Sequence, residues 1–576
     1  MSNKNWKVLP RIEQNFIEKY PQYNEIILQL LWNRGLKEKE EIREFLEFDF
    51  VKNIHDPFLF QDMETAVELI IVHIKKGNKI TVYGDYDADG VTSSVLLSEV
   101  LQTLKAKTEI YIPDRVSEGY GLNKEAIDYI DTTNTKLIIT VDGGIRNKEI
   151  VEYIQKKNIE IIVTDHHIPP EEKNEYPECL IINPSVPDEK YPFKYLAGVG
   201  VAFKLASAII QKSKLNEDDK KLLQEKVLDL VALGTVADCV KLFGENRTLV
   251  KRGLEILNKT KRIGIKELIK ASSLENRNLD SWNIGFQLAP RINAAGRMAH
   301  ANTAVELLSI SDKKEAEVLA KRLNARNMDR QKETEEIVEE IQEKIEKKLK
   351  DKILICVNEK EKDHWNEGLI GLVAGRICEK YHRPALVITR TMGGYKGSGR
   401  SIINFDLIEA VEESSEFLDK YGGHPMACGF SLNIDRINDF KNKIKGVANE
   451  KLGDEDLKPM VIIDKEIPLE EIGEDLLADI KLFEPFGQGN LNPKFLSRNV
   501  IIVNIFYMGL DGQHIKLILK NEKSGIINAV GFNQTEKLHN LSIGDKIDIV
   551  YYVDMNEYNG KSEVQMKIVD IKVFSM

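Results

Sequence analysis

The chain has few cysteines and no long hydrophobic run. Its five cysteines among 576 residues are scattered and odd in number, which argues against both a disulfide framework and a CxxC zinc site. We expect them to be core thiols. No run approaches the roughly 18 apolar residues of a membrane-spanning helix, and the opening residues MSNKNWKVLPRIEQNF lack the apolar stretch of a signal peptide. These absences predict a cytoplasmic protein.

The charge is acidic overall but unevenly distributed. With 42% hydrophobic and 30% charged residues, the composition is that of a soluble globular protein, and the net charge is −11. The stretch 241–297 carries twelve lysines and arginines against five acidic residues, a local excess of +7. Such a stretch is either a solvated helix face or a surface that follows phosphates, and the sequence alone leaves both open.

The residue pattern changes along the chain, whose length is enough for about four domains. Strand-like runs such as KITVYG and KLIITVDGG alternate with amphipathic stretches, which predicts an α/β fold of parallel βαβ units. Apolar residues four apart between Ile337 and Leu349 predict a long amphipathic helix, and six short β-rich runs near the end predict a small barrel of the OB-fold type. We expect five parts: an N-terminal helical segment (1–75), a parallel-sheet catalytic domain (76–310), a connecting helix (311–351), a smaller α/β domain (352–452) and the barrel (456–576).

The stretch VYGDYDADGVTSS places three carboxylates, Asp85, Asp87 and Asp89, at alternate positions before a glycine. Like charges this close resist burial unless a cation shares the site. The spacing matches the first half of an EF-hand calcium loop, but the twelfth position, which needs a glutamate, is Leu96. Because a β-branched run precedes the carboxylates and an apolar helix-like segment follows, we expect them at the carboxyl end of a strand, where open α/β sheets bind ligands.

Three further segments end in the same kind of side chain. LIITVDGG contains Asp142, IIVTDHH carries Asp165, His166 and His167, and VALGTVAD ends at Asp238. Oxygen-rich ligands with one or two imidazoles suit Mn²⁺ or Mg²⁺ better than Zn²⁺. A lone strand-end aspartate is more often a helix cap, but four such clusters in order predict a metal site. Two divalent ions together activate a water and stabilise displacement at phosphorus, so we expect phosphodiester hydrolysis without a covalent protein nucleophile.

These motifs carry a family resemblance. GDYDADG, VDGG, TDHH and GTVAD resemble the four motifs of the DHH phosphoesterase superfamily, and the chain resembles its RecJ branch of single-strand-specific 5′ to 3′ exonucleases. HWNEGLIGLVAGRI extends the likeness beyond the catalytic part, YKGSGRS and YGGHPMACGF resemble the DHHA1 module, and EPFGQGNLNPKF resembles the phrase before the barrel of that branch. The resemblance covers nearly the whole chain.

The resemblance implies a role for each motif residue. Two divalent ions, Mn²⁺ or Mg²⁺, would be held by Asp87, Asp89, Asp142, His166 and Asp238, with Asp142 as a bridge and Asp85 as a further ligand. His167 would face the substrate or leaving group, and Asp165 would orient the imidazoles. The chain departs from the pattern at two positions: related pyrophosphatases have a histidine in place of Tyr83, and RecJ sequences often have one in place of Asn366. Asp85 is the candidate to complete the metal shell that lacks this histidine.

Candidate substrate contacts come from three further stretches. The arginines of APRINAAGRMAH either fork onto a phosphate or pin a loop to a helix. A glycine-rich turn in GGYKGSGRSIIN and the turn at GGH resemble the DHHA1 substrate face, which would grip the end of the strand. The predicted contacts are Arg291, Arg297, Lys396, Ser398, Arg400, Asn404, Gly423 and His424. Barrel aromatics either stack bases or pack in the core; they include Phe506, Tyr507, Tyr551 and Tyr552.

The resemblance implies a metal-dependent exonuclease that degrades single-stranded DNA from the 5′ end to 5′-mononucleotides in DNA repair and recombination. A narrow passage between the two α/β domains would exclude a duplex by its width. One alternative, a phosphodiesterase for short oligonucleotides or cyclic dinucleotides, is disfavoured by the appended barrel; another, a replication scaffold with a degenerate catalytic domain, is disfavoured by the complete set of motif carboxylates. We expect single-stranded DNA as substrate, a helicase and a single-strand-binding protein as partners, and a monomer.

Overall fold

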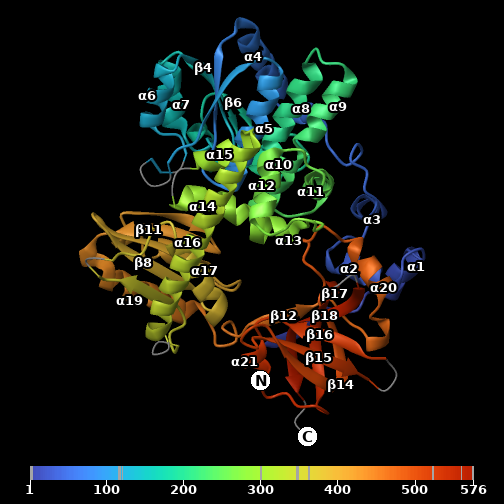
Figure 1. Ribbon diagram of the computed structural model, residues 1–576. Coiled ribbons are helices and arrows are strands. Elements are labelled where there is room, and N and C mark those ends of the chain that lie inside the picture. The colour runs from blue at the N-terminus through green and yellow to red at the C-terminus, as the bar shows by residue number, and fades with distance from the viewer. Residues whose placement is uncertain are drawn as a thin grey trace.

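The computed structural model describes residues 4–114, 118–119, 121–298, 301–345, 349–360, 363–521, 525–558 and 561–573. Figure 1 shows three bodies: a first α/β domain at the top, a second α/β domain at the lower left and a C-terminal β domain at the lower right. The α/β fold class expected from the sequence is confirmed by the strand pairing of the two α/β domains.

The first α/β domain is built on a five-stranded parallel sheet. Its strands are β2 (Lys79–Tyr83), β3 (Lys107–Tyr111), β4 (Thr135–Thr140), β5 (Glu160–Thr164) and β6 (Leu180–Ile182), in the order β3-β2-β4-β5-β6. Branched apolar residues such as Ile80, Val82 and Ile139 are buried, as expected for a sheet covered on both faces. The chain leaves β2 for β3 and then returns to β4 on the other side of β2. This reversal is a topological switch point, the place where open α/β sheets bind ligands.

Helices surround this sheet and extend the domain beyond it. They are η1 (Pro57–Leu59), α4 (Met63–Lys76), α5 (Ala88–Thr103), α6 (Lys124–Thr132), α7 (Lys148–Lys156), η2 (Lys173–Glu175), α8 (Gly198–Lys212), α9 (Glu217–Lys226), α10 (Leu228–Ala237), α11 (Gly244–Leu257), α12 (Ile263–Ala271), α13 (Ser281–Asn283), the π-helix η3 (Ile284–Leu288), α14 (Ala289–Met298) and α15 (Asn302–Ser309). α5, α8 and α10 pack against one another and are buried almost all round, which explains why their sequences are apolar on every face.

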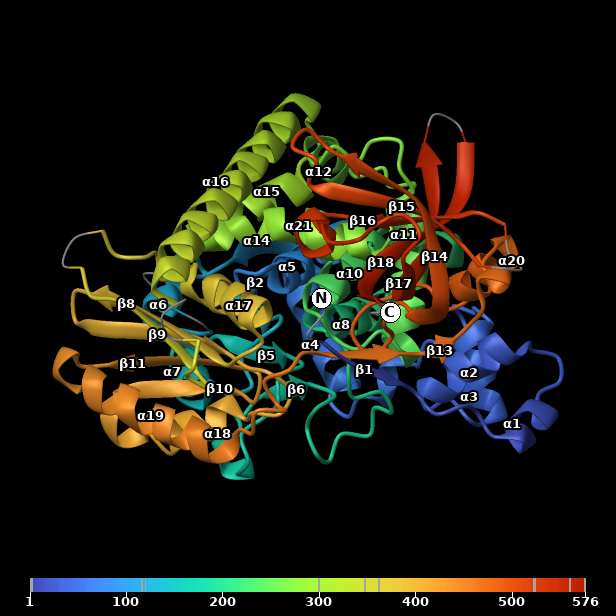
Figure 2. The ribbon, with the colours of Figure 1, turned by 90° about the horizontal axis from the view of Figure 1, so that it is seen from below.

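One long helix, α16 (Lys313–Ile345), joins the two α/β domains, as the spacing of its apolar residues predicts. Figure 2 shows it running from α12 and α15 of the first domain to α17 of the second. Leu319 and Leu323 belong to the core of the first domain, whereas Ile337, Ile341 and Ile345 belong to that of the second. In the described part of the chain, no helix is long and apolar enough to cross a membrane.

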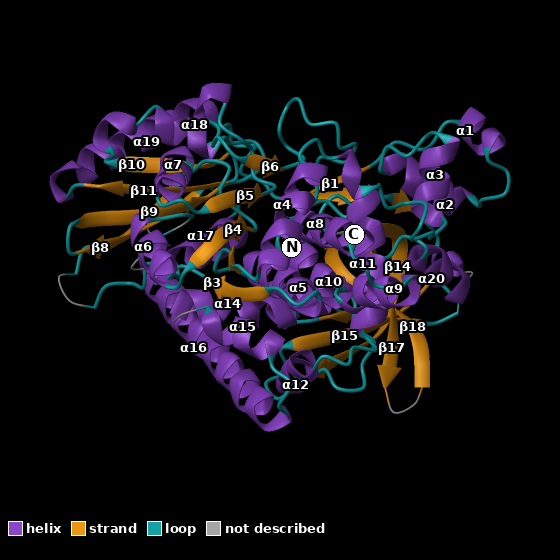
Figure 3. Ribbon diagram, turned by 90° about the horizontal axis from the view of Figure 1, so that it is seen from above, coloured by secondary structure: helices purple, strands orange, loops and turns teal. Residues whose placement is uncertain are grey.

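The second α/β domain has a mixed sheet of order β10-β11-β9-β8-β7. Its elements are β7 (Leu354–Asn358), α17 (Ile370–Tyr381), β8 (Ala385–Thr391), β9 (Gly394–Arg400), α18 (Leu407–Glu412), η5 (Ser415–Phe417), β10 (Lys420–His424), β11 (Ala427–Leu432), η6 (Ile434–Arg436) and α19 (Ile437–Lys451). Figure 3 shows α18 and α19 on one side of the sheet and α17 on the other. Its core contains the thiols of Cys356, Cys378 and Cys428, whereas Cys239 is exposed, contrary to expectation.

The C-terminal β domain closes on itself. Its elements are β12 (Met460–Ile463), β13 (Lys465–Glu466), η7 (Leu469–Glu471), α20 (Glu474–Lys481), β14 (Phe495–Met508), β15 (His514–Lys520), β16 (Ile527–Gly531), α21 (Thr535–Leu538), β17 (Lys546–Tyr558) and β18 (Lys561–Val573). The sheet order is β13-β14-β15-β16-β18-β17, and β14 also pairs with β17, so the strands form the predicted barrel. Tyr551 is buried in its core, whereas Phe506 and Tyr507 are exposed.

The N-terminal segment divides between two bodies and is not the single helical part that the sequence predicts. β1 (Asn5–Val8) pairs in parallel with β12, and α1 (Gln14–Lys19), α2 (Glu25–Asn33) and α3 (Lys39–Leu46) share a core with the C-terminal β domain. α4 instead packs in the core of the first α/β domain. Helical periodicity shows which residues of a helix are buried but not which distant partner buries them, so this division has no signal in the sequence.

Candidate metal centre

The three alternating aspartates lie in the turn from β2 into α5, at the switch point of the sheet. Asp87 caps α5, because its Oδ1 accepts hydrogen bonds from Asp89 N and Gly90 N at 2.9 and 3.0 Å. The next amide, Ala88 N, donates to Asn293 Oδ1 at 2.7 Å. A side chain at Gly90 would lie within 2.7 Å of the Asp85 backbone, so the turn needs a glycine there.

Asp89 is fixed by the first turn of α8. Its Oδ2 accepts a hydrogen bond from Gly198 N at 2.7 Å, and its Oδ1 accepts one from Val199 N at 2.8 Å. The amides at a helix N-terminus favour a negative charge, so this contact holds the carboxylate in place. A Cβ atom at residue 198 would lie 2.6 Å from Asp142 Oδ1, so only glycine allows the helix to approach the aspartates this closely.

Two further strand ends bring in the remaining groups. Asp142 follows β4 with a positive φ of 59° and is buried. Asp165 follows β5 and is also buried; its Oδ1 accepts hydrogen bonds from His166 N at 2.7 Å and His167 N at 3.0 Å, and its Oδ2 accepts one from Ile145 N. The His167 Nδ1 atom lies 2.7 Å from Asp165 Oδ1. Asp165 therefore orients the two histidines through their backbone and one ring.

The predicted metal ligands converge. In each of three groups, one ligand atom per residue lies within 4.8 Å of the others: Asp89, His166 and Asp238; Asp85, Asp87 and Asp142; and Asp142, His166 and His167. Asp238 reaches the cluster from the C-terminal end of α10, and its Oδ2 lies 3.7 Å from His166 Nε2. Asp142 and His166 each belong to two groups, and His166 Nε2 lies 3.1 Å from Asp142 Oδ1.

The pKa values of the clustered side chains are shifted in the way expected of a cation-binding site. Burial, together with the charges of neighbouring carboxylates, raises the pKa of Asp89 to about 7 and that of Asp238 to about 9, and raises the pKa of Asp142 well above its ordinary value. Burial, and then the nearby His167, lowers the pKa of His166 to about 4, so its imidazole is neutral at pH 7 and can bind a metal.

The donor set fits divalent ions. Asp142 Oδ1, His166 Nε2 and Asp238 Oδ2 are buried and make no hydrogen bond to any described residue, although they face one another. Buried polar atoms without partners are costly, and a cation in their midst would satisfy all three. Carboxylate oxygens with a single neutral imidazole suit Mn²⁺ or Mg²⁺ better than Zn²⁺.

The two departures from the family pattern have structural counterparts. The Tyr83 hydroxyl donates to Gly121 O at 3.0 Å, and its side chain packs in a separate core beside β3. Asp85 has a ligand atom within 4.8 Å of ligand atoms of Asp87 and Asp142, and its role in completing a metal shell stays a prediction. Asn366 Oδ1 accepts a hydrogen bond from Gly368 N at 2.9 Å and so shapes the loop before α17.

The predicted glycine-rich turns are strands, which corrects the sequence interpretation. Lys396, Ser398 and Arg400 lie at alternate positions of β9 and therefore share one face. The glycines between them face the core, where a Cβ atom at residue 397 would lie 2.2 Å from the Phe430 ring and one at residue 399 would lie 2.6 Å from Leu386. Gly423 and His424 lie on β10, which pairs with β11. Glycine here allows close packing rather than a turn.

Several predicted substrate contacts also hold the protein together. Arg291 donates to Asn324 Oδ1 and Gln287 O, and Arg297 donates to Gly368 O of the second domain at 3.0 Å. Asn404 donates to Asp456 Oδ1 at 2.8 Å on the surface. Within the basic stretch 241–297, Arg247 is buried and donates to Leu482 O and Phe483 O, so part of the local positive excess joins domains rather than facing a polyanion.

Some residues of the site act through their backbone or through their neighbours, so the sequence gives little or no signal for them. Nothing in a sequence marks the amides of Gly198 and Val199 as partners of Asp89. Asn293 had a signal, because it lies inside the motif APRINAAGR, which was examined only for its arginines. Arg330 of α16 has no motif to mark it. α16 packs against α14 and α17, and burial, followed by the charges of Arg376 and Arg291, lowers the pKa of Arg330.

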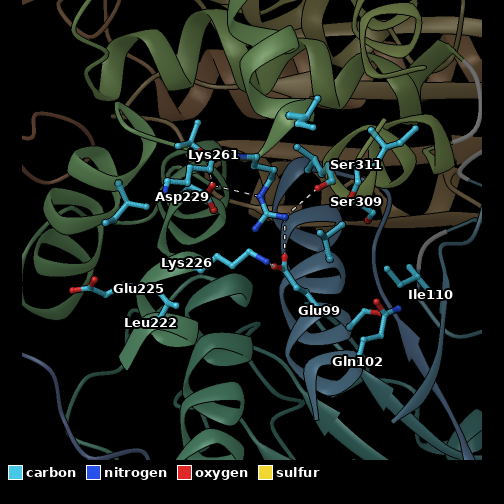
Figure 4. A pocket seen from close by; sticks show the side chains of 18 of the residues that line it. Glu99, Gln102, Ile110, Leu222, Glu225, Lys226, Asp229, Lys261, Ser309 and Ser311 are labelled. Carbon is cyan, nitrogen blue, oxygen red and sulfur yellow. Dashed lines mark hydrogen bonds and ion pairs between the residues drawn. The ribbon is translucent and has the colours of Figure 1, made fainter. Parts of the chain in front are cut away.

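A pocket of about 710 Å³ lies in another part of the first α/β domain, away from the metal centre, between α5, α9, α12, α15 and β3. Figure 4 shows Glu99, Lys226 and Asp229 on its walls. Arg262 donates from Nη1 to Glu99 Oε2 at 2.8 Å and from Nε to Asp229 Oδ2 at 3.4 Å, and Lys226 pairs with Glu99. Glu99 lies ten residues after Asp89 on α5, or roughly 15 Å along the helix. We interpret the arginine as a cross-link between helices.

Glu99→Gln is therefore expected to lower the free energy of unfolding by about 1–2 kcal/mol, because it leaves the guanidinium of Arg262 with less compensating charge in a largely buried place. Urea unfolding measures this loss. Glu217→Gln removes the exposed partner of Lys220 and should change stability by less than about 0.5 kcal/mol. Equal effects of the two variants would show that the cross-link contributes nothing.

Comparisons with known proteins agree with this geometry. Family models match residues 79–235 (DHH family, N-terminal domain), 350–450 (DHHA1 domain) and 463–570 (RecJ OB domain). The single-stranded-DNA-specific exonuclease RecJ of Bacillus subtilis is 37% identical to this chain, and the match covers 95% of this chain and 68% of that protein. The single-stranded-DNA-specific exonuclease RecJ of Escherichia coli is 32% identical, and the match covers 95% of each protein. The crystal structure of RecJ in complex with Mn²⁺ from Thermus thermophilus matches with a TM-score of 0.81 and 26% identity, over 99% of this chain and 80% of that one.

A parallel sheet with aspartates and histidines at its switch point, followed by a DHHA1 domain, defines a phosphoesterase of the DHH class. The C-terminal barrel, matched by the RecJ OB model, and the extent of the identity narrow this class further. The chain belongs to the RecJ family, and the resemblance seen in its motifs is confirmed.

Proposed function

We propose that the chain is a metal-dependent exonuclease that hydrolyses single-stranded DNA from its 5′ end, releases 5′-mononucleotides, and acts in the cytoplasm in DNA repair and recombination. The observation that carries this proposal is the convergence of five carboxylates and two imidazoles from four separate segments at the switch point of the sheet. The names of its relatives support the substrate: they are single-stranded-DNA-specific exonucleases. We also propose that it works as a monomer beside a helicase and a single-strand-binding protein.

Two divalent ions, when bound, supply Lewis-acid stabilisation of the phosphoryl group and a water of lowered pKa. The residues that would hold them are Asp85, Asp87, Asp89, Asp142, His166 and Asp238. The amides of Gly198 and Val199 keep Asp89 in place, and Asp165 keeps the histidine backbone in place. The protein therefore presents a preorganised set of ligands for the two ions.

His167 is the proposed proton donor. Burial opposes its charge, but the hydrogen bond and charge of Asp165 outweigh burial and raise the pKa of His167. Because Nδ1 is directed at Asp165, the second ring nitrogen, Nε2, is the atom that can reach a substrate. The His167 side chain is 40% exposed, unlike that of Asp165. We infer that it gives its proton to the leaving 3′ oxygen of the released nucleotide.

One assay tests the proposed function against its alternatives. Strands labelled at the 5′ or the 3′ end, duplexes and dinucleotides are incubated with Mn²⁺ or with chelator. Release of mononucleotides from the 5′ end of single strands supports the proposal. Activity confined to dinucleotides would point to a small-substrate phosphodiesterase, and binding without cleavage would point to a scaffold.

Arg400→Ala is expected to weaken binding of single-stranded DNA in a salt-dependent way. Arg400 shares a face of β9 with Lys396 and Ser398, and its guanidinium is half-buried beside α17. Loss of one phosphate contact should make the slope of log affinity against log salt less steep by about 0.7. Anisotropy titrations at several salt concentrations measure this slope.

The matched control is Lys443→Ala, which removes the same charge from the exposed face of α19, on the other side of the sheet. This control should leave affinity and slope unchanged. If Arg400→Ala also leaves them unchanged, Arg400 does not belong to the substrate face.

A further inference from the structure

Two large aromatic side chains stand exposed next to each other on the first α/β domain. Trp282 is 55% exposed and Phe286 is 67% exposed, and their rings are stacked with centroids 5.3 Å apart and planes inclined by 26°. Exposed aromatic surface of this kind is unfavourable in water, and where it is clustered it commonly marks a binding site. Neither ring belongs to the hydrophobic core of the domain, so packing does not account for their position.

The helix that carries them leads to the metal centre. α13, η3 and α14 form one continuous helix from Ser281 to Met298. Its inner side, with Ile284, Leu288 and Ile292, is fully buried. At its start, Ser281 Oγ donates to Phe486 O of the C-terminal part, and near its end Asn293 holds Ala88 of the metal loop. Figure 1 shows α13 on the side of this domain that faces the other two.

The aromatic pair lies on the turn where this helix widens into a π-helix, Ile284–Leu288. Such wide turns are rare and occur frequently at functional sites. Within this turn, Gln287 O accepts a hydrogen bond from Arg291 Nη1 at 2.6 Å. Arg291 lies on the same helix between Phe286 and Asn293, the residue that contacts the metal loop.

Two further arginines add positive charge near Arg291. Arg291, Arg330 and Arg376 lie close enough for the charges of the other two to lower the pKa of Arg330, after the larger effect of burial. The buried Nε of Arg330 makes no hydrogen bond within the described residues. Aromatic rings followed by cations are the combination with which proteins hold single-stranded nucleic acid, since rings stack on bases and cations track phosphates.

We propose that Trp282 and Phe286 form a base-stacking platform that grips the part of the single strand on the 3′ side of the bond being cut. This inference rests on the proposed nuclease function. From Asn293 to the two rings is 7 to 11 residues of helix, or about 10–16 Å. That length corresponds to about three to five nucleotides at the 3.4 Å spacing of a stacked strand. Strands shorter than this reach the metals without reaching the platform.

Length-dependent binding tests the platform. In an Asp142→Asn background, which prevents cleavage, the anisotropy of labelled trinucleotide and of a strand of about 20 nucleotides is titrated with protein. Trp282→Ala and Phe286→Ala should each weaken binding of the long strand by roughly tenfold and leave the trinucleotide within about twofold. Trp282→Phe and Phe286→Tyr keep a ring and should bind nearly as well as the parent. Tyr129→Ala, which removes a 53% exposed ring from α6, is the matched control and should have no effect.

Fluorescence gives an independent reading. The chain has four tryptophans, of which Trp282 is markedly exposed. Base stacking should quench its emission when the long strand binds, and the quench should disappear in Trp282→Phe. A quench that persists in that variant, or equal losses for both strand lengths in the alanine variants, would overturn the platform.

Failure of the platform and failure of the nuclease are separate outcomes. In the otherwise unchanged protein, the alanine variants should raise KM for the long strand and leave hydrolysis of the trinucleotide unchanged. If the parent protein does not cleave single strands at all, the proposed function is wrong. If the parent cleaves them and the alanine variants match it at every length, only the platform is wrong.

Discussion

Asp142→Asn is expected to reduce cleavage of single-stranded DNA by at least about 1,000-fold, because several kcal/mol of stabilisation at phosphorus depend on the ions it would hold. Asparagine is the informative replacement. Residue 142 has a φ of 59°, a conformation that asparagine tolerates almost as well as aspartate and alanine does not. The variant therefore keeps the backbone and removes the charge.

Metal binding separates a bridging role from a simple ligand role. Asp142 lies within ligand distance of Asp85 and Asp87 on one side and of His166 and His167 on the other, whereas Asp238 belongs only to the group with Asp89 and His166. Asp142→Asn should weaken binding of both Mn²⁺ ions, and Asp238→Asn should weaken one. Titration followed by electron paramagnetic resonance counts the ions in each variant.

Binding of DNA provides the control for folding. The Asp142→Asn protein should bind a single strand with nearly the parental affinity, since the substrate face of β9 is unchanged. Asp131→Asn removes an exposed carboxylate at the end of α6 and should alter neither cleavage nor metal binding. Cleavage by Asp142→Asn above about one tenth of the parental rate would show that this aspartate does not hold a required ion.

The order of the candidate metal ligands along the sequence follows from the fold. Asp85, Asp142 and Asp165 each follow a run of branched apolar residues, and the carboxyl ends of parallel strands meet at one edge of a sheet. Asp238 is harder to predict, because it lies at the end of a helix rather than of a strand. Only its place in the motif GTVAD marks it as a candidate. The sequence indicates that these groups lie near one another, but only the structure shows that their ligand atoms come within 4.8 Å.

Other parts have no signal along the chain. Lys396 to Arg400 was interpreted as a glycine-rich turn, yet it is a strand, and Gly397 leaves room for the Phe430 ring on the next strand. β1 is four residues long, and its partner β12 lies more than 450 residues away in sequence. Trp282 and Phe286, four residues apart, carry no signal in the sequence that they are exposed, and only the structure shows that the opposite face of the helix is buried. In each case the deciding neighbour is distant in sequence.

The second large effect is a loss of stability of the metal-free protein as the pH rises. Asp89 and Asp238 have pKa values of about 7 and 9 in the folded state, raised first by burial and then by neighbouring carboxylates, against about 4 in an unfolded chain. A group whose folded pKa is raised contributes stability below its unfolded pKa and loses it as the pH rises through the folded pKa. Between about pH 6 and pH 9 the first α/β domain should therefore lose stability, on the order of 1 kcal/mol per pH unit.

Divalent ions should reverse this loss, because they favour the ionised carboxylates that repel one another in their absence. The difference in melting temperature between protein with Mg²⁺ and protein with chelator should thus widen from about pH 6 to pH 9. Calorimetry at several pH values measures both curves on the same protein. Asp238→Asn supplies the matched variant, since it removes one repelling charge: without metal it should melt higher than the parent at alkaline pH and show a flatter dependence on pH. A gap between the two curves that stays constant with pH would mean that these aspartates are ionised without a cation, and the reason for expecting one at the switch point of the sheet would be gone.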